Sequence, residues 1–212
     1  VIYNITYFKE GIKYSFPLFL NGIMIYSFAL IDRFLINDIL GSEAVGLYVG
    51  VFQISSVLQV LGSSFSAAWF PWVFNYLADN KTSGNILEYS FSLLGLFAIV
   101  CSFFYVFMDN FMYFILGSNF IDGEFLLFGF VLGIFFQITY WIFSPIIQYN
   151  KKNLVLTYPI IPILLCSLFL NFYFLERQGL VFASLVYAMS WFLLALITVL
   201  YSFKLVNAFK NL

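Results

Sequence analysis

The sequence has little charge and no histidine. Only 9% of its 212 residues are Asp, Glu, Lys or Arg, whereas about 25% carry charge in an ordinary soluble domain. Nine basic residues stand against ten acidic ones, so no basic excess is available to hold nucleic acid. The chain has two cysteines, Cys101 and Cys166, and no metalloprotease or phosphate-loop motif. These absences exclude a nucleic-acid-binding protein and predict that the chain is no enzyme, with no catalytic residue, metal site or cofactor.

Apolar residues make up most of the sequence. Hydrophobic residues make up 63% of the chain and aromatic residues 23%, and the mean hydropathy is +0.99. A soluble fold of this size cannot bury that much apolar surface, because a large share of its residues must face water. The composition therefore indicates an integral membrane protein.

The charged residues divide the sequence into long uncharged runs, and six of these are long enough to cross a bilayer core, which takes about 20 helical residues. The runs are apolar on all sides, which favours helices over barrel strands. The sequence predicts an all-α polytopic membrane helical bundle with six transmembrane helices in one domain, 1–212. The expected spans are 14–36, 46–70, 87–108, 124–149, 154–175 and 179–203. The second is expected to end at Phe70, with a kink at Pro71.

Basic residues are distributed unevenly between the two sides of this bundle. With the N-terminus in the cytoplasm, seven of the nine basic residues fall in inside segments and only Arg33 and Arg177 fall outside. The seven are Lys9, Lys13, Lys81, Lys151, Lys152, Lys204 and Lys210. Cytoplasmic segments carry such an excess of Lys and Arg. We therefore predict a multi-pass protein with both termini in the cytoplasm.

Polar side chains inside the first span share one face. Asn21 and Asp32 are eleven residues apart, which places them within about 20° of each other around a helix. Arg33 has two interpretations. It either anchors a helix end at the membrane interface or offers a positive charge to an anion at the mouth of a cavity.

Polar residues also recur at helical spacing in the second and fourth spans. The second span carries Ser56, Gln59, Ser63 and Ser66, and the fourth carries Gln137, Trp141, Ser144 and Gln148. Such stripes face either a neighbouring helix, as hydrogen-bonding contacts, or a hydrated cavity. The pairs Gly46/Gly50 and Gly129/Gly133 predict close helix packing. Asn171 lies near the outer end of the fifth span.

Several short motifs resemble a known family. Ser15-Phe16-Pro17-Leu18 opens a helix that ends in Asp32-Arg33, and Gly46-Leu47-Tyr48 and Ala68-Trp69-Phe70-Pro71 follow. Together they resemble the polysaccharide biosynthesis flippases, which translocate O-antigen and capsule repeat units. These belong to the multidrug/oligosaccharidyl-lipid/polysaccharide exporter superfamily. The resemblance implies one lobe of a twelve-helix flippase-like fold, namely its C-terminal six-helix half.

The resemblance also implies a substrate and roles for particular residues. The substrate would be an undecaprenyl-pyrophosphate-linked oligosaccharide, moved by alternating access across the bacterial inner membrane. Arg33 would face the anion and Asp32 would take part in ion or proton coupling. The remaining cavity or lobe-interface residues would be Asn21, Ser56, Gln59, Ser63, Gln137, Ser144 and Asn171. Besides the lipid bilayer, the expected partner is a missing N-terminal lobe or a second copy of the chain.

Three other functions stay open at this point. A drug/cation antiporter of the same superfamily requires an acidic residue deep in a span, and Asp32 is the one candidate. A polysaccharide polymerase or ligase is a membrane enzyme with a large basic outer loop, whereas the outer loops here are short and acidic. A nonfunctional fragment is the third alternative.

Overall fold

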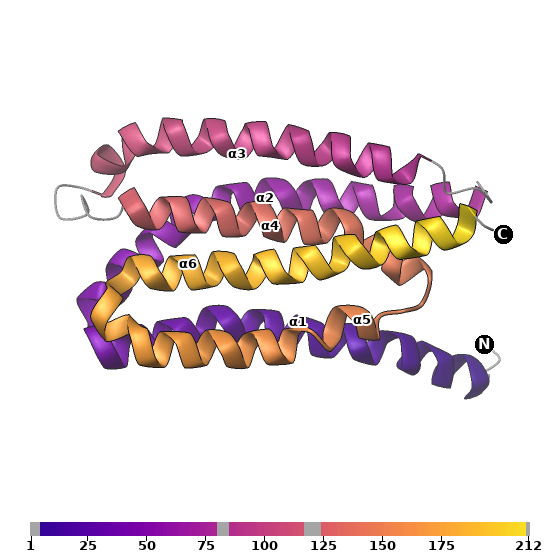
Figure 1. Cartoon of the computed structure of the whole chain (residues 1–212), viewed down its shortest axis with the longest axis horizontal. Helices are drawn as coiled ribbons and strands as arrows, with labels where there is room; N and C mark the ends of the chain where they lie inside the picture. Colours follow the sequence, from indigo (N-terminus) through magenta and orange to yellow (C-terminus); the bar gives the residue numbers. More distant parts are fainter. Residues whose placement is uncertain (1–4, 80–84, 117–123, 211–212) are drawn as a thin grey trace.

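The computed structural model describes residues 5–79, 85–116 and 124–210, and these form helices without any strand (Figure 1). The helices are α1 (Ile5–Leu40), α2 (Ser42–Asp79), α3 (Ile86–Leu116), α4 (Glu124–Tyr149), α5 (Leu154–Thr157) and α6 (Ile160–Lys210). Five helical segments are long and apolar enough to cross a membrane. A helix satisfies its backbone hydrogen bonds internally, which hydrocarbon requires. The prediction of an all-helical chain is confirmed for the described residues.

Helix α6 is a hairpin of two helical arms. Gly179 interrupts it with φ 70° and ψ −167°, a left-handed backbone that glycine adopts at low cost. Figure 1 shows the arms, 160–178 and 180–210, running side by side in opposite directions. The apolar segment Leu154–Asn207 has 54 residues and would be about 81 Å long as a straight helix. The reversal lies where the sequence predicts the boundary between the fifth and sixth spans.

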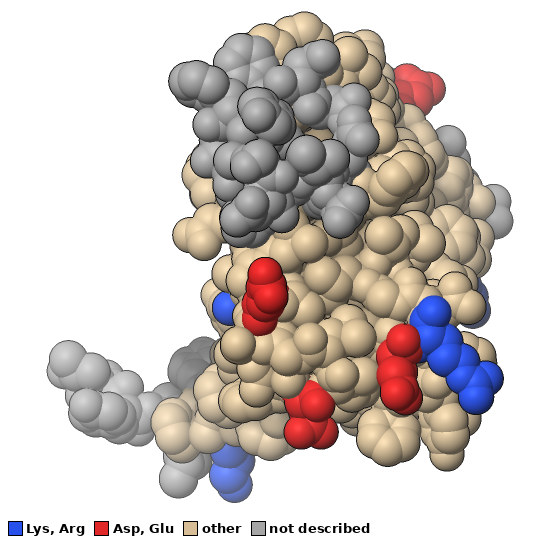
Figure 2. All heavy atoms as spheres, turned by 90° about the vertical axis from the view of Figure 1, so that its left-hand side faces the viewer, with Lys and Arg blue, Asp and Glu red and all other residues tan. Residues whose placement is uncertain are grey.

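The helices are arranged so that α1 begins and α6 ends at the same end of the bundle (Figure 1). The turn between α4 and α5 lies at this end too. Lysines gather there, on the first turns of α1, in the α4–α5 turn and near the end of α6: Lys9, Lys13, Lys151, Lys152 and Lys204. Lys81 lies outside the described residues. Figure 2 shows the opposite end, where isolated charged side chains are scattered over a largely uncharged surface.

Helix α4 is the central helix and packs against α2, α3 and α6. Its two predicted packing glycines allow α6 to approach closely. A Cβ atom at Gly129 would lie 2.9 Å from the carbonyl carbon of Ser184, and one at Gly133 would lie 3.2 Å from the Cα of Ala188. The prediction of close packing is confirmed for this pair. Gly46 has no heavy atom within 4 Å of such a position, so it faces open space.

Two prolines inside helices are accompanied by side-chain donors from other helices. A proline lacks the N–H that would bond the carbonyl four residues earlier, and its ring disturbs the preceding turn. Before Pro17, the carbonyl of Tyr14 accepts a hydrogen bond from Asn153 Nδ2 at 2.9 Å. Before Pro145, the carbonyl of Ile142 accepts one from the indole N–H of Trp69, also at 2.9 Å. Each carbonyl lies three residues before its proline, in the turn that the ring disturbs, so a side chain from another segment bonds one carbonyl of each disturbed turn.

Helix α2 continues through Pro71 to Asp79, beyond the helix end expected at Phe70. Stacked aromatic rings run along this stretch at helical spacing. The ring centroids of Trp69 and Trp72 are 4.8 Å apart, and those of Trp72 and Tyr76 are 5.1 Å apart. Such pairs each contribute about 0.5–1.5 kcal/mol beyond burial, which offsets part of the cost of the proline.

Candidate functional site

A buried carboxyl group joins three helices near one end of α1. Asp32 is 3% exposed and Asn171, on the first arm of α6, is 1% exposed. The Asn171 amide Nδ2 donates a hydrogen bond to Asp32 Oδ1 at 3.0 Å. The buried phenol of Tyr48, on α2, lies close enough to interact with this carboxyl group. The structure thus brings two of the sequence-predicted site residues into direct contact, and we call Asp32, Tyr48 and Asn171 the acid cluster.

The polar side chains around Asp32, an amide and a phenol, are neutral. Among the side chains that the structure describes, no Lys or Arg makes an ion pair with it. A carboxylate in an apolar environment is costly without a paired cation. Ionisable groups inside a membrane are therefore rare, and they usually mark ion or substrate pathways. This makes the acid cluster the strongest candidate for a functional site in the described chain.

Arg33 has a different environment from its sequence neighbour, because adjacent helical residues point about 100° apart. Its side chain is half-buried, and its guanidinium carbon lies 5.9 Å from the centre of the Phe52 ring on α2. A cation over an aromatic face at this distance is attracted by the ring electrons. Arg33 therefore packs beside α2 and faces a different side of α1 from Asp32.

Asn21 lies further along the buried side of α1 and is 7% exposed. Its Nδ2 donates to the hydroxyl of Tyr140 on α4 at 3.0 Å and to the carbonyl of Leu156 on α5 at 3.1 Å. Both bonds cross between helices. In the described structure, Asn21 therefore connects α1 to α4 and α5 through hydrogen bonds.

The two predicted polar stripes meet at one point. Gln59 Nε2, on α2, donates to Gln137 Oε1, on α4, at 3.0 Å. The serine hydroxyls turn back onto their own helices: that of Ser56 donates to the carbonyl of Gln53 and that of Ser63 to the carbonyl of Val60. Ser144 bonds within α4 in the same way, to Trp141 at 3.5 Å. One glutamine pair thus carries the polar contact between the stripes.

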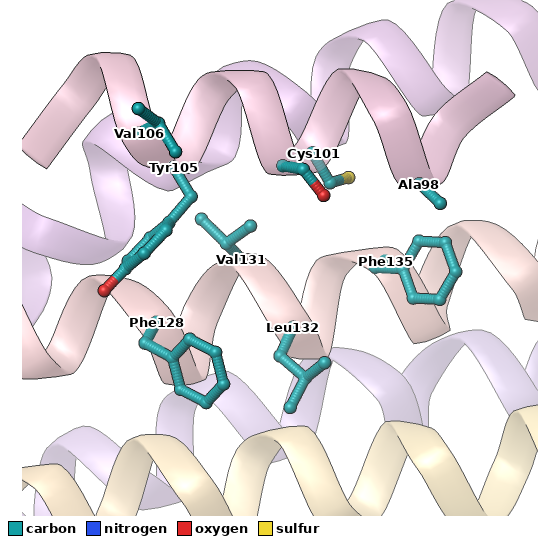
Figure 3. Close-up of a pocket in the computed structure, with 9 residues that line it drawn as sticks. Ala98, Cys101, Tyr105, Val106, Phe128, Val131, Leu132 and Phe135 are labelled. Carbon is teal, nitrogen blue, oxygen red and sulfur yellow. The ribbon is translucent and has the colours of Figure 1, made fainter. Parts of the chain in front are cut away.

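A cavity of about 310 Å³ lies between α3 and α4, and Figure 3 shows side chains from both helices facing it. Its walls are mostly apolar, including Phe128, Leu132 and Phe135, with the ring of Tyr105 at one side. None of the nine sequence-predicted site residues lines it. Among the nine, Asn21, Asp32 and Asn171 form buried hydrogen bonds between helices, and Gln59 and Gln137 form a partly buried one.

The sequence reasoning missed two tyrosines that complete these contacts. Tyr48 is 4% exposed and Tyr140 is 5% exposed. Tyr48 ends the Gly-x-Tyr motif, so its position was visible although its proximity to Asp32 was not. Tyr140 had no comparable signal, since it is one of 15 tyrosines in an aromatic-rich chain.

Comparison with known proteins links the first two helices to polysaccharide synthesis. Residues 1–77 match the family model described as polysaccharide biosynthesis protein. No curated protein and no solved structure matches the chain. The matched stretch contains α1 and nearly all of α2, and so includes Asp32, Tyr48 and Gln59. The match and the five apolar helices fit a membrane protein with a polysaccharide-related function.

Proposed function

We propose that this chain takes part in moving an undecaprenyl-pyrophosphate-linked oligosaccharide across the bacterial inner membrane. The observation that carries the proposal is the family match over residues 1–77, because the matched stretch supplies two members of the acid cluster. The sequence resemblance to repeat-unit flippases points to the same function. A translocase needs no catalytic groups of its own, since no covalent bond of the substrate changes.

The proposed topology has six crossings, with each arm of α6 counted as one. The end of the bundle that carries the chain termini and the lysine-rich turns faces the cytoplasm. Two facts support this orientation: α1 begins and α6 ends at one end (Figure 1), and basic residues favour the cytoplasmic side of membrane proteins. The Gly41 turn and the Gly179 reversal then face the outside.

The acid cluster is the proposed coupling point. Asp32, Tyr48 and Asn171 connect α1, α2 and the first arm of α6. A proton or a cation that binds Asp32 changes the net charge of this junction without first breaking an ion pair. Such a change favours one arrangement of the three helices over another, which alternating access requires. Arg33, beside Phe52, would attract the pyrophosphate of the substrate.

A second six-helix lobe, or a second copy of this chain, is the proposed partner. Alternating access takes two bodies that move against each other around a shared site. The surface of α2 offers a suitable face, because Ser63 is exposed next to Val60 and Leu61, which are 62% and 51% exposed. Polar groups that face lipid are unfavourable, so a protein surface over Ser63 would stabilise the assembly.

Complementation of a flippase-deficient bacterial strain tests this function. The chain alone should not restore surface polysaccharide, whereas the chain expressed with the N-terminal lobe of a repeat-unit flippase should. Asp32→Asn should abolish the rescue, while Asp38→Asn, an exposed acid on the same helix, should leave it intact. Failure of every lobe combination, with correct membrane insertion, would contradict the proposal.

The burial of Asp32 favours one second candidate, a drug/cation antiporter of the same superfamily. A buried acid in a span is the feature that such an antiporter requires. Expression of the same assembly in a drug-sensitive strain distinguishes the two functions. Resistance to cationic drugs without restored polysaccharide would favour the antiporter.

A further inference from the structure

A large pocket opens at the lysine-rich end of the bundle, between the start of α1, the end of α2 and the α4–α5 turn. Its volume is about 980 Å³. Its polar lining comes from Lys13, Gln148, Lys151 and Asn153, and its apolar lining includes Tyr14, Phe16, Phe74 and Tyr149. Neither the acid cluster nor any other sequence-predicted site residue lines it. We call it the lysine pocket.

The lysine pocket has two basic residues and no acidic residue in its lining. The two are Lys13 and Lys151, whose side chains are exposed. Within the part of the chain whose side chains are described, neither lysine forms an ion pair. Gln148, which is half-buried, adds an amide group to the lining, and Asn153, 3% exposed, holds the wall through its bond to the Tyr14 carbonyl. The pocket thus suits a ligand with an anionic group and hydroxyl donors.

The backbone at Lys151 is unusual for a lysine. Its φ is 58°, in the left-handed region that favours glycine or asparagine. The residue follows α4 in a Schellman turn. Its N–H donates a hydrogen bond to the carbonyl of Gln148 at 2.9 Å, and the N–H of Lys152 donates one to the carbonyl of Ile147 at 3.2 Å. Glycine is the usual residue at this position. A lysine that keeps a strained conformation at a pocket wall points to a role for its side chain.

The aromatic wall of the pocket fits a ligand that remains in the membrane. Phe74 and Tyr149 meet edge to face, with ring centroids 5.6 Å apart. Tyr14 and Phe16, on α1, also line the pocket. Tyrosines and lysines together are typical of the membrane interface. Basic pockets between transmembrane helices bind the head groups of anionic lipids.

We propose that the lysine pocket binds the head group of a lipid that carries both a phosphate and hydroxyl groups. Lys13 and Lys151 hold the phosphate, and the Gln148 amide contacts the hydroxyl groups. A volume of about 980 Å³ exceeds the need of a phosphate alone and leaves room for a glycerol or a sugar. Phosphatidylglycerol and a glycosylated polyprenyl pyrophosphate share this chemistry. This proposal concerns head-group binding only, so a test of it does not depend on whether the chain takes part in translocation.

Lys152 provides a matched control. It adjoins Lys151 in the same turn, but its Nζ lies 5.8 Å from the centre of the Tyr201 ring on α6, and it does not line the pocket. Lys152→Gln therefore removes one positive charge from the same end of the bundle without changing the lining. Lys151→Asn removes the pocket charge and retains a residue that accepts the left-handed backbone.

Native mass spectrometry of the 212-residue chain in detergent tests the proposal. The probes are phosphatidylglycerol, a glycosylated polyprenyl pyrophosphate, phosphatidylcholine and inorganic phosphate, each at matched concentrations. At least one of the two phosphate-and-hydroxyl lipids should bind at least tenfold more tightly than phosphatidylcholine, and which of them binds identifies the source. Lys13→Gln with Lys151→Asn should abolish that preference, whereas Lys152→Gln should leave it unchanged. Retained helicity by circular dichroism checks each variant's fold.

Three results would overturn the proposal. Phosphatidylcholine could bind as tightly as the anionic lipids, which would show that the charge is not used. Lys152→Gln could weaken binding as much as Lys151→Asn, which would show a diffuse surface effect. Inorganic phosphate could bind while neither lipid does, which would assign the pocket to a soluble anion.

Discussion

Because α4 and α6 are in close contact, we predict that replacing glycine with alanine has opposite effects on the free energy of unfolding at two positions. Glycine to alanine in a helix gains about 1 kcal/mol from backbone propensity. At Gly95, on α3, no heavy atom lies within 4 Å of the new methyl group. Gly95→Ala should therefore raise the free energy of unfolding by up to about 1 kcal/mol.

At Gly129 the methyl group has no space. It would lie 2.7 Å from Ser184 Cβ and 2.9 Å from the Ser184 carbonyl carbon, and backbone cannot move aside as a side chain can. Overpacking of this kind costs about 3 kcal/mol, which exceeds the gain in propensity. We expect Gly129→Ala to lose about 2 kcal/mol net. At Gly133 the nearest atoms, at 2.5 Å, belong to the Tyr187 ring, so its loss should be smaller.

Unfolding in mixed micelles, with rising denaturing detergent and circular dichroism as the signal, measures these differences. The expected order of stability is Gly95→Ala, then the parent chain, then Gly133→Ala, then Gly129→Ala. If Gly129→Ala is as stable as the parent, α4 and α6 do not pack as described.

Three further variants test buried polar contacts by the same unfolding measurement. Asn171→Leu should lower the free energy of unfolding by about 2 kcal/mol, because it removes a donor from a buried carboxyl group. The loss should be about half as large when Asp32→Asn is also present. Equal losses in the two backgrounds would refute the contact. Gln59→Leu and Gln137→Leu should each destabilise the chain, while the double variant should recover part of the loss, with a coupling of about 0.6 kcal/mol; strict additivity would contradict the bond. Trp69→Phe should cost about 1 kcal/mol, since phenylalanine cannot donate to the carbonyl beside a proline, and an unchanged stability would show that this carbonyl needs no donor.

The helical class could be predicted because charge-free runs of this length have one common solution in a membrane. The helix boundaries could not be predicted as well. Helices α1 and α2 extend to Leu40 and Asp79, because a helix can continue beyond the hydrocarbon core, where polar residues again meet water. The reversal at Gly179 lies at a predicted boundary, since charges at Glu176 and Arg177 interrupt the apolar sequence there.

The partners of the site residues were beyond reach for a different reason. Helical phase gives the face of a helix on which Asn21 and Asp32 lie, but not the helix that this face meets. Asp32 and Asn171 are 139 positions apart, and only tertiary packing brings them together. The same holds for Lys13 and Lys151, which the sequence placed on one side of the membrane and the structure places around one pocket.

The most direct test of the proposed function is a transport measurement with purified components. The chain and an N-terminal flippase lobe are reconstituted together into proteoliposomes that contain a fluorescent polyprenyl-pyrophosphate oligosaccharide. A membrane-impermeant quencher then reports how much of the label reaches the outer leaflet. Transfer should depend on both lobes and be lost in Asp32→Asn, and fluorescent phosphatidylcholine should not be transferred. Transfer that is unchanged by Asp32→Asn, or equal for both lipids, would contradict the proposed function.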